Sequence, residues 1–550
     1  MTSCKNKPLA FLLCCLIVAF QANAQDISLE EDDIFNIPSV RVSSLRQIKP
    51  DAVGLLLSSD HRVLNDDVWK NSKYANVVRR FRKTRNLNNF PAAETLRRKL
   101  LLLAAPPPAG TPEGAFVKTR LKELYRKGYF QNILDILAQL PPSTLDLTTA
   151  DLEINTNFFI NNPERACNAV KKMPDDDVDR QKQNVICAAL QKDENKTLLP
   201  LAMLEEQKVR DDFLTEAADA LIAGKNSTQA DPKQPTPLNF FLLAKFKKEP
   251  PAFFWKSKTD NVLNALVILD SAPVDKKIEI AEKLVQRGVL PPENLATLYK
   301  TPSFDNFVPD DSSPYLLRAY LFQQALKPRD DVERAKRLTV FLSNARNNGI
   351  FVGGALAAGE ILDGFDGFYD ISPTTANAEI IKALVLNGEL FKAENIMDDY
   401  YKNLMPNETE AESWHIVKMA KSGKSYLLPR FERMMAYKEK HPPKNGDIVK
   451  EIDRLMLIFE TLGKQHPTEA WMYTSFADNS PERKFLDALH SNAPLQGVPA
   501  AKGEQALEAL EHLDGSYVGM LETVQRLKAA GLDEEARQIA AQAVAAGLSG

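Results

Sequence analysis

The hydrophobic residues of this 550-residue chain follow a helical spacing from about Asp51 onward. Apolar positions recur near the i, i+3, i+4 and i+7 spacing that places them on one face of an α-helix. The first such set is Val68, Trp69, Ala75, Val78 and Phe81. A second apolar segment, 92–103, is stopped by three prolines, and a third, 115–140, is stopped by two. Because proline cannot continue a helix, the pattern predicts an all-α protein whose helices are joined by polar, proline-containing loops.

Glycine is scarce, with 23 among 550 residues, or about 4% against a usual value of about 7%. Four of these glycines follow a leucine at the same Leu-x3-Gly spacing, where glycine can end a helix in the left-handed conformation. They are Gly128, Gly288, Gly388 and Gly531. After the last two, Ala393 and Ala536 follow five residues later, and a helix-like segment continues.

This turn resembles the one inside a tetratricopeptide-type helical hairpin, whose glycine and alanine have the same separation. The four glycines are not spaced by multiples of about 34 residues, the tetratricopeptide period. The resemblance therefore implies a degenerate, tetratricopeptide-like α-solenoid, an irregular stack of antiparallel helical hairpins. Whether the helices form one continuous solenoid or separate subdomains stays open.

Breaks in the pattern divide the chain into six segments. We expect a signal peptide at 1–24, a flexible N-terminal arm at 25–50, an N-terminal helical region at 51–225, a linker at 226–237, a middle helical region at 238–370, and a C-terminal tetratricopeptide-like region at 371–550. The linker is predicted from its composition, NSTQADPKQPTP, which is rich in polar residues and proline.

The first 24 residues have the three parts of a secretory signal. Lys5 and Lys7 precede the apolar run 9–20, and Ala22 and Ala24 are the small residues that signal peptidase requires. The run is shorter than the about 20 apolar residues that a bilayer span needs. We therefore expect cleavage between Ala24 and Gln25 and a mature bacterial protein in the periplasm or outside the cell, with a retained anchor as the alternative.

Two cysteines remain once the signal is removed. Cys4, Cys14 and Cys15 lie within it, which leaves Cys167 and Cys187, each in a helix-like segment. In an oxidising compartment, two such cysteines indicate one disulfide between antiparallel helices; two buried thiols are the alternative. The order of signal, Trp69 segment, Ala-Ala-Pro-Pro joint and cysteine pair is similar to that of a group of uncharacterised secreted helical proteins of alphaproteobacteria. That resemblance supports the compartment and the all-α fold and implies no function.

The charge distribution disfavours one class of partner and suggests another. The formal net charge is −4, and removal of the two lysines of the signal leaves 67 basic and 73 acidic residues, or −6. A mildly acidic chain is a poor candidate for a general nucleic-acid binder. The stronger of two basic regions comprises Arg79, Arg80, Arg82, Lys83 and Arg85, continued by Arg97, Arg98 and Lys99. We expect this patch to contact anionic lipid or an acidic partner; a solvated helix face is the alternative.

A second candidate interaction site is an aromatic segment between two helical regions. Gly364 and Gly367 lie next to Phe365, Phe368 and Tyr369. Because glycine permits many backbone conformations, this composition predicts a flexible loop that presents Phe365, Phe368 and Tyr369 to a partner. The alternative is a tight turn whose aromatic side chains fill a neighbouring groove.

The sequence contains no complete catalytic, cofactor or metal motif. Its six histidines form no HExxH pair. Asp175, Asp177 and Asp179 alternate as calcium ligands do, but Arg180 stands where a calcium loop needs glycine. These carboxylates are better explained as a helix start, where they accept bonds from backbone N–H groups. We therefore expect no cofactor, no bound metal and no catalytic residue.

These observations favour a non-catalytic helical-repeat protein that acts as a protein-interaction scaffold in the cell envelope, since stacked hairpins present long surfaces. Its expected partners are envelope proteins and not nucleic acid, with peripheral contact to anionic lipid or peptidoglycan. The oligomeric state stays open. The alternative function is that of a peptidoglycan-associated protein related to the superhelical part of lytic transglycosylases.

Overall fold

The computed structural model describes residues 49–57, 63–87, 89–174, 177–305, 309–310, 312–365, 375–401, 417, 420–421, 447–464, 471, 474–491 and 494–547. All of these residues lie in one compact unit, Ile48–Gly550. They form 24 α-helices and one pair of two-residue parallel strands, which confirms the all-α prediction. The predicted signal peptide, its cleavage site at Ala24 and Gln25, and nearly all of the predicted arm 25–50 lie outside the described residues.

The first half of the chain contains the only strands of the described part. They are β1 (Leu56–Leu57) and β2 (Leu103–Ala104). The helices are α1 (Tyr74–Lys83), α2 (Pro91–Leu102), α3 (Ala115–Lys127), α4 (Phe130–Leu137), α5 (Leu147–Phe159), α6 (Pro163–Val170), α7 (Val178–Leu190), α8 (Glu194–Glu206), α9 (Asp212–Ile222), α10 (Pro237–Lys245) and α11 (Asp260–Ile268). Short 3₁₀ helices occupy Pro50–Ala52, Pro142–Thr144 and Phe254–Lys256.

In the second half of the described chain, helices are the only regular secondary structure, and loops join them. Its helices are α12 (Val274–Gln286), α13 (Pro292–Lys300), α14 (Pro314–Leu326), α15 (Asp331–Asn347), α16 (Phe351–Ala357), α17 (Gly359–Asp363), α18 (Thr375–Leu386), α19 (Leu390–Tyr401), α22 (Asp447–Thr461), α23 (Pro481–His490), α24 (Lys502–Glu511), α25 (Tyr517–Ala529) and α26 (Asp533–Ala545). No helix in the described ranges is long and apolar enough to cross a membrane.

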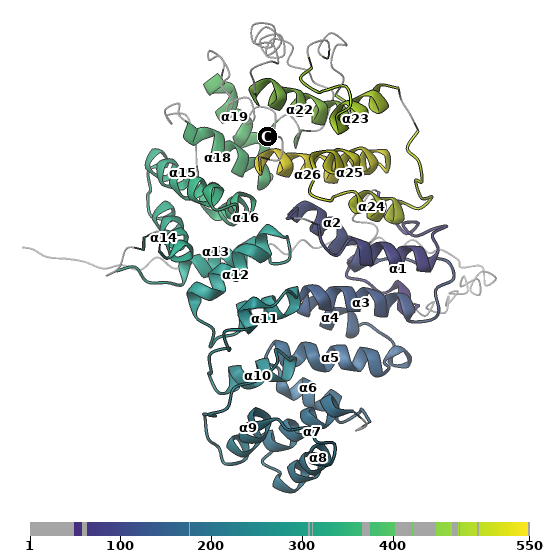
Figure 1. The fold of residues 1–550 in the computed structure, drawn as a ribbon, viewed down its shortest axis with the longest axis vertical. Helices are drawn as coiled ribbons and strands as arrows, with labels where there is room; N and C mark the ends of the chain where they lie inside the picture. Colours follow the sequence, from purple (N-terminus) through teal and green to yellow (C-terminus); the bar gives the residue numbers. More distant parts are fainter. Residues whose placement is uncertain are drawn as a thin grey trace, which may run out of the picture. The chain divides into compact units, whose positions relative to one another are not determined.

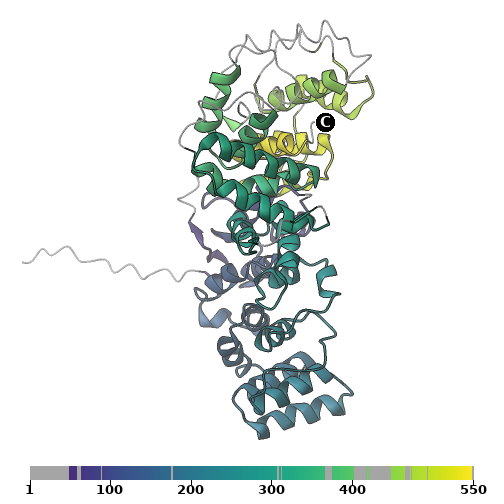
Figure 2. The ribbon, with the colours of Figure 1, turned by 90° about the vertical axis from the view of Figure 1, so that its left-hand side faces the viewer.

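The helices stack in a solenoid-like way, but the chain reverses its path twice. It runs outward from α3 to α9 and returns through α10, which packs on α5, and α11, which packs on α3 (Figure 1). It then continues through α12 to α19, and the last helices return to the first: α24 packs on α1 and α2, and α26 packs on α2, α16 and α18. In Figures 1 and 2 the purple N-terminal helices therefore adjoin both the blue helices and the yellow C-terminal ones.

All four predicted leucine-to-glycine turns are confirmed. Gly128, Gly288, Gly388 and Gly531 have left-handed φ angles of 77°, 73°, 81° and 81°. In each turn the N–H of the residue after the glycine donates to the carbonyl of the leucine, at 2.9 to 3.1 Å, which is the bond that defines a Schellman helix end. Ala393 and Ala536 are fully buried in the helices that follow, so their small side chains allow close packing as expected.

The contact between α24 and the N-terminal segment depends on a glycine. The backbone N–H of Gly503 donates to the carbonyl of Val68 at 2.8 Å. A Cβ atom at Gly503 would lie 2.6 Å from the ring of Trp69, which is fully buried against Phe81 and Phe116. The absence of a side chain therefore lets α24 lie against the indole and close the second reversal.

Buried ion pairs also join helices that are distant in sequence. Lys127 of α3 bridges Glu94 of α2 and Asp260 of α11 at 3.3 and 3.1 Å. Arg318 of α14 and Glu282 of α12 form a pair in which each side chain is 2% exposed, at 2.6 Å. Burial raises the pKa of Glu282, although Arg318 opposes that shift. Because removal of one partner would leave a buried charge without compensation, these pairs specify which helices meet.

Candidate functional site: a polar groove beside the disulfide

The predicted basic patch is divided by intramolecular ion pairs. Arg80 of α1 binds two carboxylates of α24, Glu504 at 3.2 Å and Glu511 at 2.9 Å. Lys83 binds Glu511 at 3.0 Å. The side chain of Arg80 is 11% exposed, so it serves the contact between α1 and α24. The prediction that it belongs to an open surface patch is therefore wrong.

The other members of the basic patch have different environments. Arg85 binds Glu123 of α3 at 2.5 Å. Arg79 and Arg82 are exposed and have no ion-pair partner within the part of the chain that the structure describes. The two exposed arginines, with the half-exposed Lys83, are what is left of the predicted surface for anionic lipid or an acidic partner.

The prediction that this patch continues along α2 is wrong for Arg97. Arg97 is fully buried and pairs with Glu94 at 3.4 Å and Glu123 at 2.7 Å. Arg98 lies over the ring of a neighbouring tyrosine, and Lys99 binds Glu535 of α26 at 3.3 Å. The charges in this sequence therefore hold α2 against its neighbours and do not extend the exposed surface of α1.

The aromatic segment is partly described. Phe365 is 3% exposed, and the guanidinium of Arg334 lies 5.3 Å from the centre of its ring. Phe365 thus fills a site between helices, as in the tight-turn alternative, and does not face solvent. Phe368 and Tyr369 lie outside the described residues.

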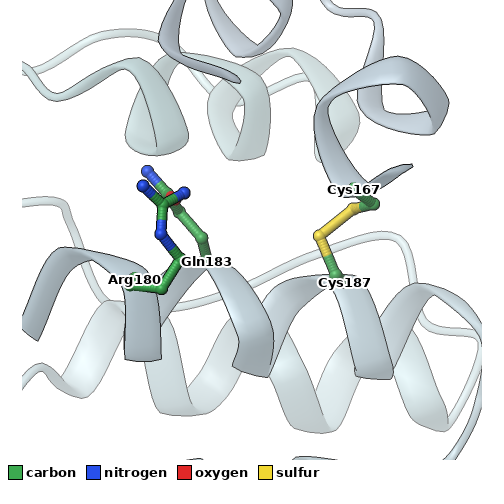
Figure 3. The surroundings of a disulfide bond; sticks show 4 residues. All are labelled: Cys167, Arg180, Gln183 and Cys187. Atoms are coloured by element: carbon green, nitrogen blue, oxygen red, sulfur yellow. A yellow bond between two sulfur atoms is a disulfide. The ribbon is translucent and has the colours of Figure 1, made fainter. Parts of the chain in front are cut away.

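The cysteine pair forms the predicted disulfide. Cys167 of α6 is bonded to Cys187 of α7, with Cα atoms 5.5 Å apart. Gln183 and Arg180 precede Cys187 on α7 by four and seven residues, a spacing that places the three on one helix face. Figure 3 shows these side chains on the same side of α7. Because the disulfide ties this face to α6, it restricts rotation of α7 and so directs Arg180 and Gln183.

Arg180 is the most buried charge in this region, at 2% exposure. Its Nη1 donates to Oε1 of Gln183 at 2.6 Å, and its Nη2 donates to Asp151 of α5. The amide of Gln183 in turn donates to Asn155 of α5 at 3.4 Å. Within the described part of the chain, the buried Nε of Arg180 has no hydrogen-bond partner. These bonds form a polar rung between α5 and α7.

This rung lies at one side of a groove of about 560 Å³. The groove is lined by Asp151, Asn155, Asp177, Val178, Asp179, Arg180, Lys182, Gln183, Arg210, Asp211, Leu214, Lys233, Gln234, Thr236, Pro237, Leu238 and Asn239. Four of these residues are basic, four are acidic and four carry amides. The groove therefore has no net charge and offers closely spaced donors and acceptors.

The starts of three helices meet at the groove. Asp177 accepts from the N–H of Arg180 at 2.7 Å at the start of α7, Asp211 accepts from Leu214 at 3.2 Å at α9, and Thr236 accepts from Asn239 at 3.3 Å at α10. The helix-start interpretation of the acidic segment is thus confirmed at Asp177. Such caps satisfy N–H groups that have no partner in the helix, and they also fix the positions of the capping side chains.

Ion pairs complete the walls. Lys182 binds Asp211 at 2.8 Å, and Arg210 and Lys233 bind Asp212 at 2.9 and 3.8 Å. The hydrogen bond from Arg210 lowers the pKa of Asp212. The groove can therefore recognise a polar ligand through hydrogen bonds to both its donors and its acceptors. Within the described ranges, His, Cys, Asp and Glu residues form no group of three that could hold a metal ion.

Sequence reasoning did not identify this groove. Its residues come from α5, α7, α9, α10 and the predicted linker, so no local motif connects them. The available signals were the capping residues Asp211 and Thr236 before apolar segments, together with the position of Cys187 on the same helix as Arg180. Comparisons with known protein families and with curated proteins find no match.

Proposed function

We propose that this protein is a non-catalytic scaffold of the cell envelope, exported by its N-terminal signal, and that the polar groove binds a segment of a partner protein. One observation carries the proposal: four helices surround an open groove whose charges and amides are held in position by a disulfide, helix caps and ion pairs. Such a surface binds without reorganising its side chains, which lowers the entropic cost of association.

An extended polar segment fits this groove better than an apolar anchor does. Among its 17 lining residues, Val178, Leu214, Pro237 and Leu238 are apolar, and the other 13 carry hydrogen-bonding or charged groups. A partner segment with alternating charges and free backbone amides would pair with both kinds of group. The proposed compartment is the periplasm, since a disulfide is compatible with an oxidising environment.

A pull-down with groove variants tests this function. Arg210→Glu combined with Lys233→Glu reverses two exposed charges on the groove wall; Lys327→Glu combined with Arg329→Glu reverses two exposed charges elsewhere. We expect the wild type and the control to retain the same envelope protein and the groove variant to lose it. Equal recovery by all three would refute the proposal.

The same variants distinguish the scaffold function from the alternative, a peptidoglycan-associated role. If the groove serves the cell wall, purified peptidoglycan will co-sediment with the wild type and with the control, and the groove variant will stay in solution. If the protein is an enzyme of the wall, incubation with peptidoglycan will release soluble fragments. The scaffold proposal predicts neither result.

A further inference from the structure

A second cavity, of about 550 Å³, lies where several segments of the chain meet. Its walls come from α2, from the end of α12 and the turn to α13, from α16, from the end of α18 and the turn to α19, from Ala420 and from α26. Helix α26 packs on α2, α16 and α18, and α12 packs on α16 (Figure 1). The volume lies within the about 300 to 1,000 Å³ that small-ligand pockets occupy, and such pockets favour junctions of this kind.

The lining of this cavity combines polar groups with a set of apolar side chains. The apolar side chains are Pro91, Ala92, Val285, Leu290, Pro291, Pro292, Leu356, Val385, Leu386, Leu390, Ala420 and Ala541. One wall is set by Gly288, where a Cβ atom would lie 2.7 Å from the Cα of Pro91 and 2.9 Å from its carbonyl oxygen. The missing side chain of Gly288 therefore lets the turn after α12 lie directly against the start of α2 at this wall.

Two arginines without carboxylate partners border the same cavity. Arg98 and Arg537 both line it, and neither has an ion pair with any residue that the structure describes. Arg98 is held flat, because its guanidinium lies 4.5 Å from the ring centre of Tyr129 and its Nη2 donates to Asn132 at 2.7 Å. The buried Nε of Arg98 has no hydrogen-bond partner among the residues that the structure describes. Its neighbour Arg97, by contrast, binds two carboxylates.

The only carboxylate among the described lining residues forms no ion pair with either arginine. Glu534 precedes Arg537 by one turn of α26, but it accepts a hydrogen bond from Gln538 at 3.3 Å. The described lining residues therefore carry two positive charges and one negative charge beside the apolar side chains. A ligand that complements this lining has an apolar body and one anionic group.

We infer that this cavity binds a small amphipathic carboxylate, whose apolar chain lies against the leucine and valine side chains and whose carboxylate pairs with Arg98 and Arg537. The planar guanidinium group matches a carboxylate with two parallel hydrogen bonds. This site is separate from the groove beside the disulfide, so it is independent of the proposed scaffold function.

The probes that test this inference are octanoate, octanol and acetate, each titrated into the mature protein by calorimetry below the micelle concentration of octanoate. We expect octanoate to bind and both other probes to bind at least about tenfold more weakly, since each lacks one of the two recognised parts. Absence of octanoate binding, or equal binding of octanol, would overturn the inference.

Variants then locate the site. Arg537 is partly exposed on α26, and Arg537→Gln is expected to weaken octanoate binding about tenfold without changing octanol binding. Arg537→Lys should restore part of the affinity because it keeps the charge. The control Arg329→Gln removes an exposed arginine outside the cavity. Equal octanoate affinity in the wild type and in Arg537→Gln would refute the assignment, and circular dichroism checks that each variant folds.

Discussion

Removal of the disulfide tests the claim that it positions the groove. The double variant Cys167→Ala, Cys187→Ala frees α6 from α7. The two cysteines are 20 residues apart, and closing a loop of that length stabilises the folded state by about 3 kcal/mol in the chain-entropy model. Both sulfur-bearing side chains are buried, at 6% and 4% exposure, so alanine leaves the helices packed but no longer joined.

A chain of this length does not unfold in one two-state step, so the assay is hydrogen exchange of individual peptides. A loss of about 3 kcal/mol corresponds to on the order of a hundredfold faster exchange, which we expect in α6 and α7 and not in α25 and α26. Reductant should produce the same change in the wild type and none in the double variant.

Equal exchange of α7 in the variant and in the wild type would show that the disulfide does not hold α7 in position. A uniform change along the chain would contradict this role as well, because the loop closed by the disulfide lies within α6 and α7. A matched control is Ser271→Ala, which removes a buried hydroxyl that has no hydrogen-bond partner in the described ranges and should leave exchange in α7 unchanged.

Three further predictions concern stability. Arg318→Leu should destabilise the packing of α12 and α14 by about 3–5 kcal/mol near neutral pH, because it leaves the carboxylate of Glu282 buried without its ion-pair partner; hydrogen exchange of α12 and α14 should show a smaller loss when Glu282→Gln is added, and an equal loss in both variants would contradict this. Gly503→Ala should speed hydrogen exchange of α24 and α1, since its methyl group would enter the indole ring that covers this glycine; unchanged exchange in both helices would argue against the closure of α24 on the N-terminal segment. The hydrogen bond that protonated His512 donates to Glu508 raises the pKa of His512 above 6.5, so its stabilising effect is complete below pH 6.5 and is lost as pH rises through the higher folded value; hydrogen exchange of α24 and α25 should increase over that range in the wild type and not in His512→Asn.

The sequence predicts local features of this fold well. The Leu-x3-Gly turns depend on the backbone of a few consecutive residues, and all four were located correctly. The same six-to-one hydrogen bond also ends helices at Asn161, Lys192, Lys208 and Lys247, which have φ angles of 51° to 58°. The Leu-x3-Gly pattern did not indicate these turns, because none of the four residues is a glycine. A non-glycine residue adopts this conformation at a cost of about 1–2 kcal/mol, which tertiary packing offsets.

Features that depend on distant segments could not be predicted in the same way. The carboxylates that bind Arg80 lie 424 and 431 residues further along the chain. A run of basic residues has the same sequence pattern whether its side chains face solvent or a helix from the C-terminal end of the chain. The two reversals of the chain path, and both cavities that depend on them, are invisible to a pattern of hydrophobic positions for the same reason.

The most direct test of the central claim is site-specific photo-crosslinking from the groove in cells that make the protein. A photoreactive amino acid at position 233, in place of the exposed Lys233 of the groove wall, is compared with one at position 258, in place of the exposed Lys258 outside it. The scaffold account predicts one discrete crosslinked envelope protein from position 233 and none from position 258. The same product from both positions, or no product from position 233, would contradict it.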